Sequence, residues 1–175
     1  MFSLSGIMSA LIIIMGSAYI GITYASKYEI AVKQTEAFAN SMKMLEFDIS
    51  FLRLPLHEAF ERISKNQSGT VKKIYSFLSN ELKEGRSTSV GALFRTAVQK
   101  YSSELEVSEN TKNVLLDFCN CIGHMNAENE IANIKACYVK LKYYEDEARQ
   151  IAGKNVKMYR GLGLLGGIFI VLILC

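Results

Sequence analysis

The fold of this chain is organised around the stretch LEFDISFLRLPLHEAF, residues 45–60, which contains the only proline, Pro55. Leading into this stretch and through it, apolar residues recur every three or four positions, as on one face of an α-helix; they are Phe38, Met42, Leu45, Ile49, Leu52 and Leu56. A second apolar stripe, Phe47, Phe51 and Leu54, lies about 200° around the same helix. A helix that is apolar on two faces packs between others, so this one is predicted to be the central element of a bundle.

Residues 45–51 also alternate between apolar and polar, as a half-buried strand would. The helix is favoured because no other segment offers such a strand a partner. Pro55 then interrupts the helix, because its ring clashes with the carbonyl four residues earlier and disfavours helical angles at Leu54. Since proline also suits the first turn of a helix, a new helix is predicted from Pro55 to about Ser64.

The charged residues are confined to the middle of the chain. All 20 Lys and Arg and all 17 Asp and Glu lie between Lys27 and Arg160. Residues 1–26 are therefore predicted to form a transmembrane helix, long enough for the ~20 residues that a bilayer core needs. A cleaved signal peptide is the alternative, although the segment lacks a basic start and a clear small-residue cleavage site.

The opposite end is apolar but shorter. Residues 161–175 are uncharged and would span roughly 22 Å as a helix, less than the ~30 Å of the bilayer core. Adding Met158 and Tyr159, with Arg160 reaching towards the headgroups, nearly closes the gap. Residues 158–175 are predicted to form a short second transmembrane helix, and a hairpin that dips into the membrane is the alternative.

Basic residues flank both predicted membrane segments on the side of the middle region. They are Lys27 and Lys33 after the first segment, and Arg149, Lys154, Lys157 and Arg160 before the second. The positive-inside rule therefore places residues 27–157 in the cytoplasm. Lys154, Lys157 and Arg160 are also candidates for binding lipid headgroups, because anionic membrane surfaces attract basic residues.

Residues 27–157 are predicted to form a cytoplasmic bundle that is helical throughout. Turn and cap signals separate its helices; they are the cluster 66–69, Gly85, Ser87 to Ser89, Ser108 and Gly123. The apolar faces of the later helices are Val71, Ile74, Phe77, Leu78 and Leu82; Leu93, Phe94, Ala97, Val98 and Tyr101; Val114, Leu115, Phe118 and Ile122; and, from about Asn126 on, Ile131, Ile134, Tyr138, Leu141, Ala148 and Ala152. The predicted fold class is an all-α bundle of about six helices flanked by an N-terminal and a C-terminal transmembrane helix.

A glycine-rich run matches a nucleotide-binding pattern without its context. Residues 161–166, GLGLLG, fit G-x-G-x-x-G, but no predicted strand precedes them and no acidic residue follows, which argues against dinucleotide binding. Gly163 and Gly167 instead form a G-x-x-x-G face, which lets membrane helices pack closely. Small residues spaced four apart within residues 6–10 and 17–21 could receive it. The pattern also arises by chance, so specific packing stays open.

Other chemical motifs differ from the patterns they approach. On a helix, Cys119 and Cys121 would point about 200° apart, so they would not share a metal ion with His124; reduced structural cysteines are expected instead. Glu61 occupies the position of the second histidine in H-E-x-x-H. The sequence has no P-loop, and basic residues are mixed with acidic ones. We therefore predict no enzyme activity, no cofactor, no metal and no nucleic-acid binding.

Two motifs resemble a known family. The Leu-Glu-x-x-Ile run at residues 45–49 followed by Pro-Leu-x-Glu-Ala at 55–59, and the closing run KNVKMYRGLGLLGG at 154–167, resemble the stage III sporulation protein AB family of endospore-forming bacteria. That family is similar to platform protein F of type II secretion and type IV pilus machines. The resemblance implies a non-enzymatic platform of a secretion-like channel in the outer forespore membrane of the mother cell, with its soluble domain in the cytoplasm.

The resemblance also implies partners. They are the cytoplasmic ATPase stage III sporulation protein AA, other membrane proteins of the stage III complex and membrane lipid, while a homo-oligomer is left open. Glu46, Pro55 and Leu56 are the partner-binding candidates, because they belong to the matching motif; an ordinary salt bridge is the alternative for Glu46. The alternative function is a two-span membrane sensor with an extracytoplasmic helical bundle, which the basic flanks disfavour.

Overall fold

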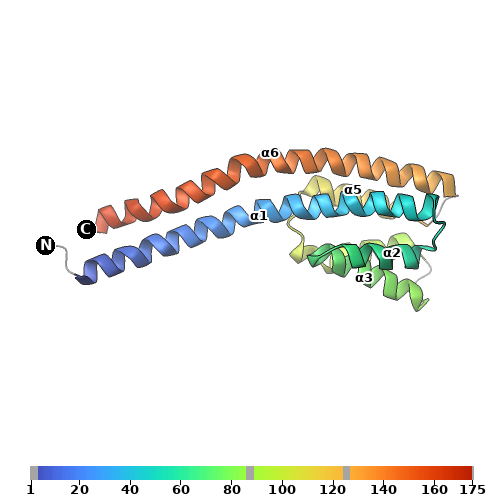
Figure 1. The fold of residues 1–175 in the computed structure, drawn as a ribbon, viewed down its shortest axis with the longest axis horizontal. Coiled ribbons are helices and arrows are strands. Elements are labelled where there is room, and N and C mark those ends of the chain that lie inside the picture. Colours follow the sequence, from blue (N-terminus) through green and yellow to red (C-terminus); the bar gives the residue numbers. More distant parts are fainter. Residues whose placement is uncertain (1–3, 86–88, 124–126, 175) are drawn as a thin grey trace. The chain divides into compact units, whose positions relative to one another are not determined.

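The computed structural model describes residues 4–85, 89–123 and 127–174. These residues form six α-helices and one short 3₁₀ helix, η1 (Figure 1). Their bounds are α1 Leu4–Ser50, α2 Leu56–Asn66, α3 Gly69–Lys83, α4 Val90–Lys100, η1 Ser102–Glu104, α5 Glu109–Cys121 and α6 Ala127–Leu174. The described part of the chain contains no strand, and the predicted all-α fold class is confirmed.

The chain divides into two compact units. One, here called the apolar pair, comprises Met1–Ile30 and Ala148–Cys175, and the other, the helical bundle, comprises Ala31–Glu147. The long helices α1 and α6 each contribute to both units and run without a break past residues 26–27 and 157–158. The domain boundaries predicted at those two places therefore remain predictions.

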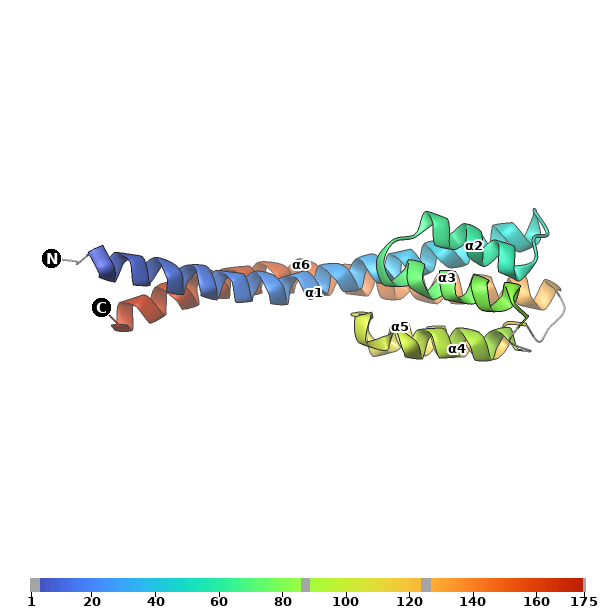
Figure 2. The same ribbon diagram turned by 90° about the horizontal axis from the view of Figure 1, so that it is seen from below.

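The bundle has a continuous apolar core. α2 packs against α3, α3 against α4, and α4 against α5 (Figure 2). Aromatic rings meet at the centre, where the ring of Phe94 lies 6.4 Å from that of Phe60, 6.0 Å from Tyr75 and 5.7 Å from Phe118. α1 contributes Phe38, Met42 and Leu45 to the same core, and α6 contributes Ile134 and Leu141. Fully burying each such large apolar side chain stabilises a fold by about 1.5–3 kcal/mol.

Four of the predicted helix-end signals act as expected. The Ser108 hydroxyl caps α5 by accepting from the Thr111 amide at 3.2 Å, and Ser89 caps α4 by accepting from the Ala92 amide. Gly85 and Gly123 follow helices with φ of 66° and 82°, the left-handed conformation that glycine adopts most easily. Ser87, the first residue of the predicted 87–89 cap, lies outside the described residues.

The turn at Pro55 is built as predicted, with one difference in where α1 ends. α1 ends at Ser50, and Arg53 then takes a left-handed φ of 50°. The amide of Leu54 donates to the carbonyl of Asp48 at 3.0 Å, which closes the turn. Pro55 is the N-cap of α2 with φ −63° and ψ 149°, so the new helix begins directly after it.

The prediction that α1 is buried on both of its apolar faces was wrong. In the stripe that carries Phe38, Met42 and Leu45 are also buried, but Leu52 at its far end is 43% exposed. In the second stripe the side chains of Phe47 and Phe51 are 46% and 73% exposed, and their rings lie 5.3 Å apart. The buried arc is widened instead by the short side chains of Ala39 and Ser41, both fully buried. Periodicity identifies an apolar stripe, but only the neighbouring helices decide whether it is covered.

Candidate functional site

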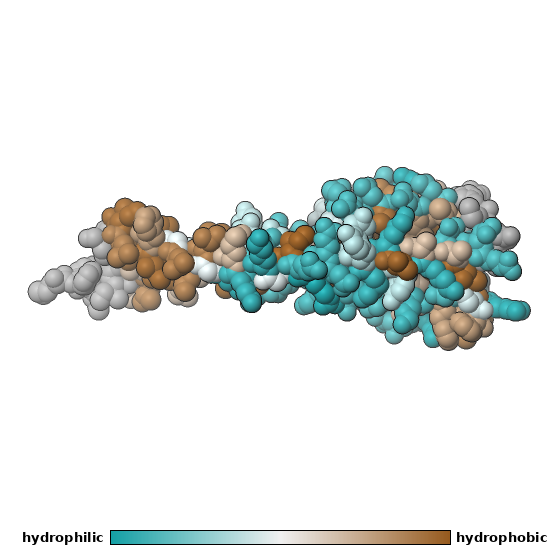
Figure 3. All heavy atoms as spheres, turned by 90° about the horizontal axis from the view of Figure 1, so that it is seen from above, coloured by the Kyte–Doolittle hydropathy of each residue, from teal (hydrophilic) through white to brown (hydrophobic). Residues whose placement is uncertain are grey.

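The apolar pair is the candidate membrane-inserting site. The first part of α1 and the last part of α6 lie side by side and run antiparallel, with both termini at the same end (Figures 1 and 2). Hydrophobic residues cover much of one end of this unit, and hydrophilic residues lie among them nearer its other end (Figure 3). Among its exposed large apolar side chains are Leu11, Ile12, Met15, Ile20, Ile22, Leu162, Leu165, Phe169, Leu172 and Ile173. Within the described chain, α1 and α6 are the two helices long and apolar enough to cross a bilayer.

Small residues bring the two helices of this unit into backbone contact. A Cβ added at Gly163 would lie 3.0 Å from the Cα of Gly21 and 3.0 Å from the carbonyl oxygen of Ser17. A Cβ added at Gly167 would lie 3.0 Å from the Cα of Ile14. The hydroxyl of Ser17 donates to the carbonyl oxygen of Gly163 at 2.6 Å. At these distances the facing backbone would have to move by a few tenths of an ångström to admit even a Cβ at either glycine.

These contacts place the two predicted packing residues. Gly163 and Gly167 both face α1, and the surface that they meet is the one at Ser17 and Gly21. The other small-residue face, at residues 6–10, lies partly outside the residues whose side chains are described. The role of Gly163 and Gly167 in membrane-helix association stays a prediction.

Polar contacts join the two helices where the charged residues begin. The ring of Tyr159 stacks between Tyr24, at 6.1 Å, and Tyr28, at 5.7 Å. At the next residue of each helix, the guanidinium of Arg160 donates a hydrogen bond to the carboxylate of Glu29 at 2.8 Å. The Arg160 and Glu29 side chains are 54% and 44% exposed, so this ion pair lies at the surface, and lipid binding by Arg160 remains a prediction.

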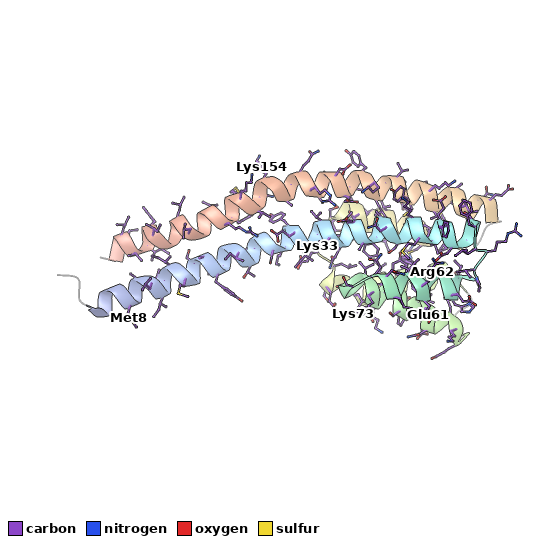
Figure 4. All side chains as sticks on the ribbon, viewed as in Figure 1. Met8, Lys33, Glu61, Arg62, Lys73 and Lys154 are labelled. Carbon is purple, nitrogen blue, oxygen red and sulfur yellow. The ribbon has the colours of Figure 1, made fainter. Side chains whose placement is uncertain are left out.

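The other two headgroup candidates are placed differently. Lys154 and Lys157 are exposed, and neither makes an ion pair with any described residue. Figure 4 places Lys154 on the outer side of α6. Two exposed lysines three residues apart lie on one face of a helix. Their lipid binding remains a prediction, and the structure leaves both ammonium groups available for it.

The partner-binding candidates lie in the bundle, in separate environments. The Glu46 carboxylate pairs with Lys135 of α6 at 3.4 Å, and its side chain is 24% exposed. Pro55 is exposed, whereas Leu56 is partly buried and packs against the core. No hydrogen bond or ion pair between described residues joins Glu46 to either of them. The ion pair is the alternative that the sequence left open for Glu46, and partner binding by these three residues remains untested.

The sequence reasoning missed an ion pair beside this turn. The Asp48 carboxylate, 1% exposed, accepts from Arg62 at 3.0 Å, while its other oxygen is buried without a partner. Burial raises the pKa of Asp48, and the positive charge of Arg62 opposes that shift. The available signal was an aspartate inside an apolar run. Arg62 also lines an open groove of 520 Å³ together with Leu54, His57, Glu58, Glu61, Lys65 and Lys83, and Figure 4 places Arg62 and Glu61 on α2.

Two of the described cysteines are placed as buried structural residues. Cys119 and Cys137 are buried, and burial raises the pKa of each thiol to about 12. Both thiols therefore stay protonated near neutral pH, a poor state for a nucleophile or metal ligand. Among the described residues no three His, Cys, Asp or Glu side chains are grouped to hold a metal; His124 lies outside them.

Comparisons with known proteins agree with one another. The family model described as "Stage III sporulation protein AB" matches residues 6–175. The stage III sporulation protein AB of Bacillus subtilis (strain 168) is 26% identical over 168 residues, which cover 96% of this chain and 98% of that protein. A solved structure with the same name matches with a TM-score of 0.66 and 23% identity, over 71% of this chain and 97% of that chain. At that identity the structural match supports the fold alone.

Proposed function

Because this chain belongs to the stage III sporulation protein AB family, we propose that it is a non-enzymatic membrane platform of a secretion-like sporulation channel. It would reside in the outer forespore membrane of the mother cell. Its helical bundle would face the cytoplasm and couple an ATPase to the channel. This role assigns no catalytic residue and no cofactor to the chain.

The observation that carries the proposal is the antiparallel packing of the two apolar helix ends. The hydroxyl of Ser17 donates a hydrogen bond to the carbonyl oxygen of Gly163, although the two residues lie 146 positions apart in the sequence. Helices joined in this way would enter a bilayer together and from the same face. The bundle, which connects them in sequence, would then be tethered to that face at both of its ends, as suits an element that transmits force or holds position.

Charge supports the cytoplasmic orientation. The apolar pair contains Lys27, Arg149, Lys154, Lys157 and Arg160 against Glu29 as its single acidic residue. All of them lie on the bundle side of the uncharged segments. The cytoplasmic flanks of membrane helices carry such an excess of Lys and Arg.

The proposed partners are proteins and lipid. The cytoplasmic ATPase would be stage III sporulation protein AA, and other membrane proteins of the stage III complex would surround the apolar pair. Glu46, Pro55 and Leu56 are the proposed contact residues for the ATPase. The exposed rings of Phe47 and Phe51 belong to the same stretch of chain and offer apolar area of the kind that anchors interfaces.

Thiol labelling tests the orientation. Ser68 is exposed and makes no capping hydrogen bond at the start of α3, so Ser68→Cys should not disturb the fold. In a variant whose native cysteines are replaced, a membrane-impermeant maleimide is expected to label Cys at this position only after the mother-cell membrane is permeabilised. Labelling in intact cells would contradict the cytoplasmic orientation and favour the two-span sensor.

A further inference from the structure

A cluster of tyrosines lies where the uncharged segments end. Tyr24, Tyr28 and Tyr159 come from both helices and stack through Tyr159. Towards the termini, residues 1–26 and 161–175 carry no charged side chain, while Lys27 and Arg160 begin the charged region. A tyrosine has an apolar ring and a polar hydroxyl, so it is favoured at the boundary between hydrocarbon and headgroups. Tyr24 and Tyr28 lie one helical turn, about 6 Å, apart along α1, so the three rings indicate the position of that boundary to within about one turn.

The basic residues of α6 nearest to this cluster differ in whether an acidic side chain pairs with them. Arg160 is paired with Glu29 at 2.8 Å, and this acidic partner compensates part of its charge. Lys157 and Lys154 follow on the bundle side of Tyr159, exposed and without an ion pair to a described residue. At about 1.5 Å per residue they lie about 3 Å and 7.5 Å from Tyr159 along the helix axis. That span matches the headgroup layer, which is about 5–8 Å thick on each side of a bilayer.

From this placement we infer that the tyrosine cluster marks the headgroup level and that Lys154 and Lys157 bind the phosphates of anionic phospholipids there. The inference rests on the proposed membrane insertion and adds a binding site of defined chemistry. Lysine chains can extend along the interface while their ammonium groups contact phosphate. Each lysine near an anionic surface favours binding by about fivefold.

Tryptophan fluorescence can measure this preference, because the chain contains no tryptophan. The full chain with Tyr159→Trp would be reconstituted in phosphatidylcholine bilayers that contain increasing amounts of brominated phosphatidylglycerol. Quenching then gives the relative affinity of the two lipids next to residue 159. We expect phosphatidylglycerol to be favoured severalfold, and Lys154→Gln with Lys157→Gln to reduce this ratio to near one.

A matched control removes two charges elsewhere. Lys43 and Lys72 are exposed residues of the bundle, and Lys43→Gln with Lys72→Gln should leave the lipid ratio unchanged. An equal loss in both double variants would show a general effect of net charge and would overturn the assigned site. An unchanged ratio in the Lys154 and Lys157 double variant would overturn it as well.

Measuring how deep single tryptophans lie in the bilayer tests this inference and the proposed membrane insertion separately. Ile12→Trp is expected to be quenched by bromines deep in the acyl chains, whereas Tyr159→Trp and, as a second reporter, Tyr24→Trp should be quenched by bromines near the headgroups. Absence of quenching at residue 12 would contradict membrane insertion itself. Deep quenching at 12 together with deep quenching at 24 and 159 would overturn only the boundary.

Discussion

The hydroxyl of Ser17 lies 2.6 Å from the carbonyl oxygen of Gly163 and donates a hydrogen bond to it. A serine reaches a backbone carbonyl of another helix only if the two backbones approach closely, and here Gly21 and Gly163 permit that approach. In hydrocarbon, small residues and such hydrogen bonds are what hold membrane helices together. We therefore expect the stability of the apolar pair to depend on this short segment.

Bulk at Gly163 should separate the two helices. Gly163→Ile places a Cβ 3.0 Å from the Cα of Gly21 and from the carbonyl oxygen of Ser17, so the two helices must move apart and dispersion contacts are lost. The change can be measured as disulfide formation between Ser17→Cys and Gly166→Cys, since a Cβ at 166 would lie 3.6 Å from the Ser17 oxygen. We expect disulfide formation to fall strongly, without unfolding of the bundle.

Gly161→Ile is the matched control for that experiment. A Cβ at Gly161 meets nothing within 4 Å, so the same substitution two residues away should leave disulfide formation unchanged. Both disulfide yields would be measured with all native cysteines replaced. Equal yields for Gly161→Ile and Gly163→Ile would contradict the close packing at Gly163.

Asp48 should make the bundle less stable as pH rises. Burial raises the pKa of its carboxyl above the ordinary value despite Arg62, so the native state binds its proton more tightly than the unfolded chain does. The unfolding free energy then decreases as pH rises from the ordinary aspartate range through the raised pKa. The side chain of the Asp48→Asn variant cannot ionise. The unfolding free energy of this variant minus that of the wild type should therefore be more positive at about pH 7 than at about pH 3. Urea unfolding followed by circular dichroism would measure this, and a difference that is independent of pH would contradict it.

Local signals in the sequence were sufficient for much of the fold. Ser108, Gly85 and Gly123 mark helix ends because hydroxyl caps and left-handed glycines act within one turn of the chain. Pro55 marks the turn for the same reason, since its clash is with its own preceding turn. Features of this kind depend on neighbours in sequence, which are known before the fold is.

Features that depend on distant segments could not be predicted in this way. Phe47 and Phe51 have the periodicity of a buried face, but no helix of the bundle covers them. The sequence offered two small-residue faces for Gly163 and Gly167, and only the register of α1 against α6 distinguishes the one at Ser17. The pairing of Arg160 with Glu29 likewise requires knowledge of that register.

The crossing of α4 and α5 should not tolerate a side chain at Gly91. Gly91 is buried, and an added Cβ would fall on the carbonyl oxygen of Cys119. Gly91→Ala is expected to destabilise the bundle by about 1–3 kcal/mol, as overpacking does. Gln99→Ala, at an exposed position of the same helix, is the control and should leave the unfolding free energy nearly unchanged. Equal urea unfolding midpoints for the two variants would contradict this account.

Charge reversal at Glu46 tests the proposed contact residue. Glu46→Arg should weaken binding of the ATPase, because like charges opposed at an interface cost several kcal/mol. The variant also breaks the ion pair with Lys135, so the double variant Glu46→Arg with Lys135→Glu, which restores that pair in reverse, is needed beside it. If Glu46 itself contacts the ATPase, the double variant stays weak. Full recovery of binding in the double variant would assign the effect to the internal ion pair.

The most direct test of the platform proposal is binding of the wild-type chain to the ATPase. The full chain would be reconstituted in lipid nanodiscs and titrated with purified stage III sporulation protein AA in a calorimeter, with empty nanodiscs as the control. The proposal predicts saturable binding to the loaded nanodiscs alone. No detectable binding by a reconstituted chain whose helical circular dichroism is intact would contradict direct coupling between this protein and the ATPase.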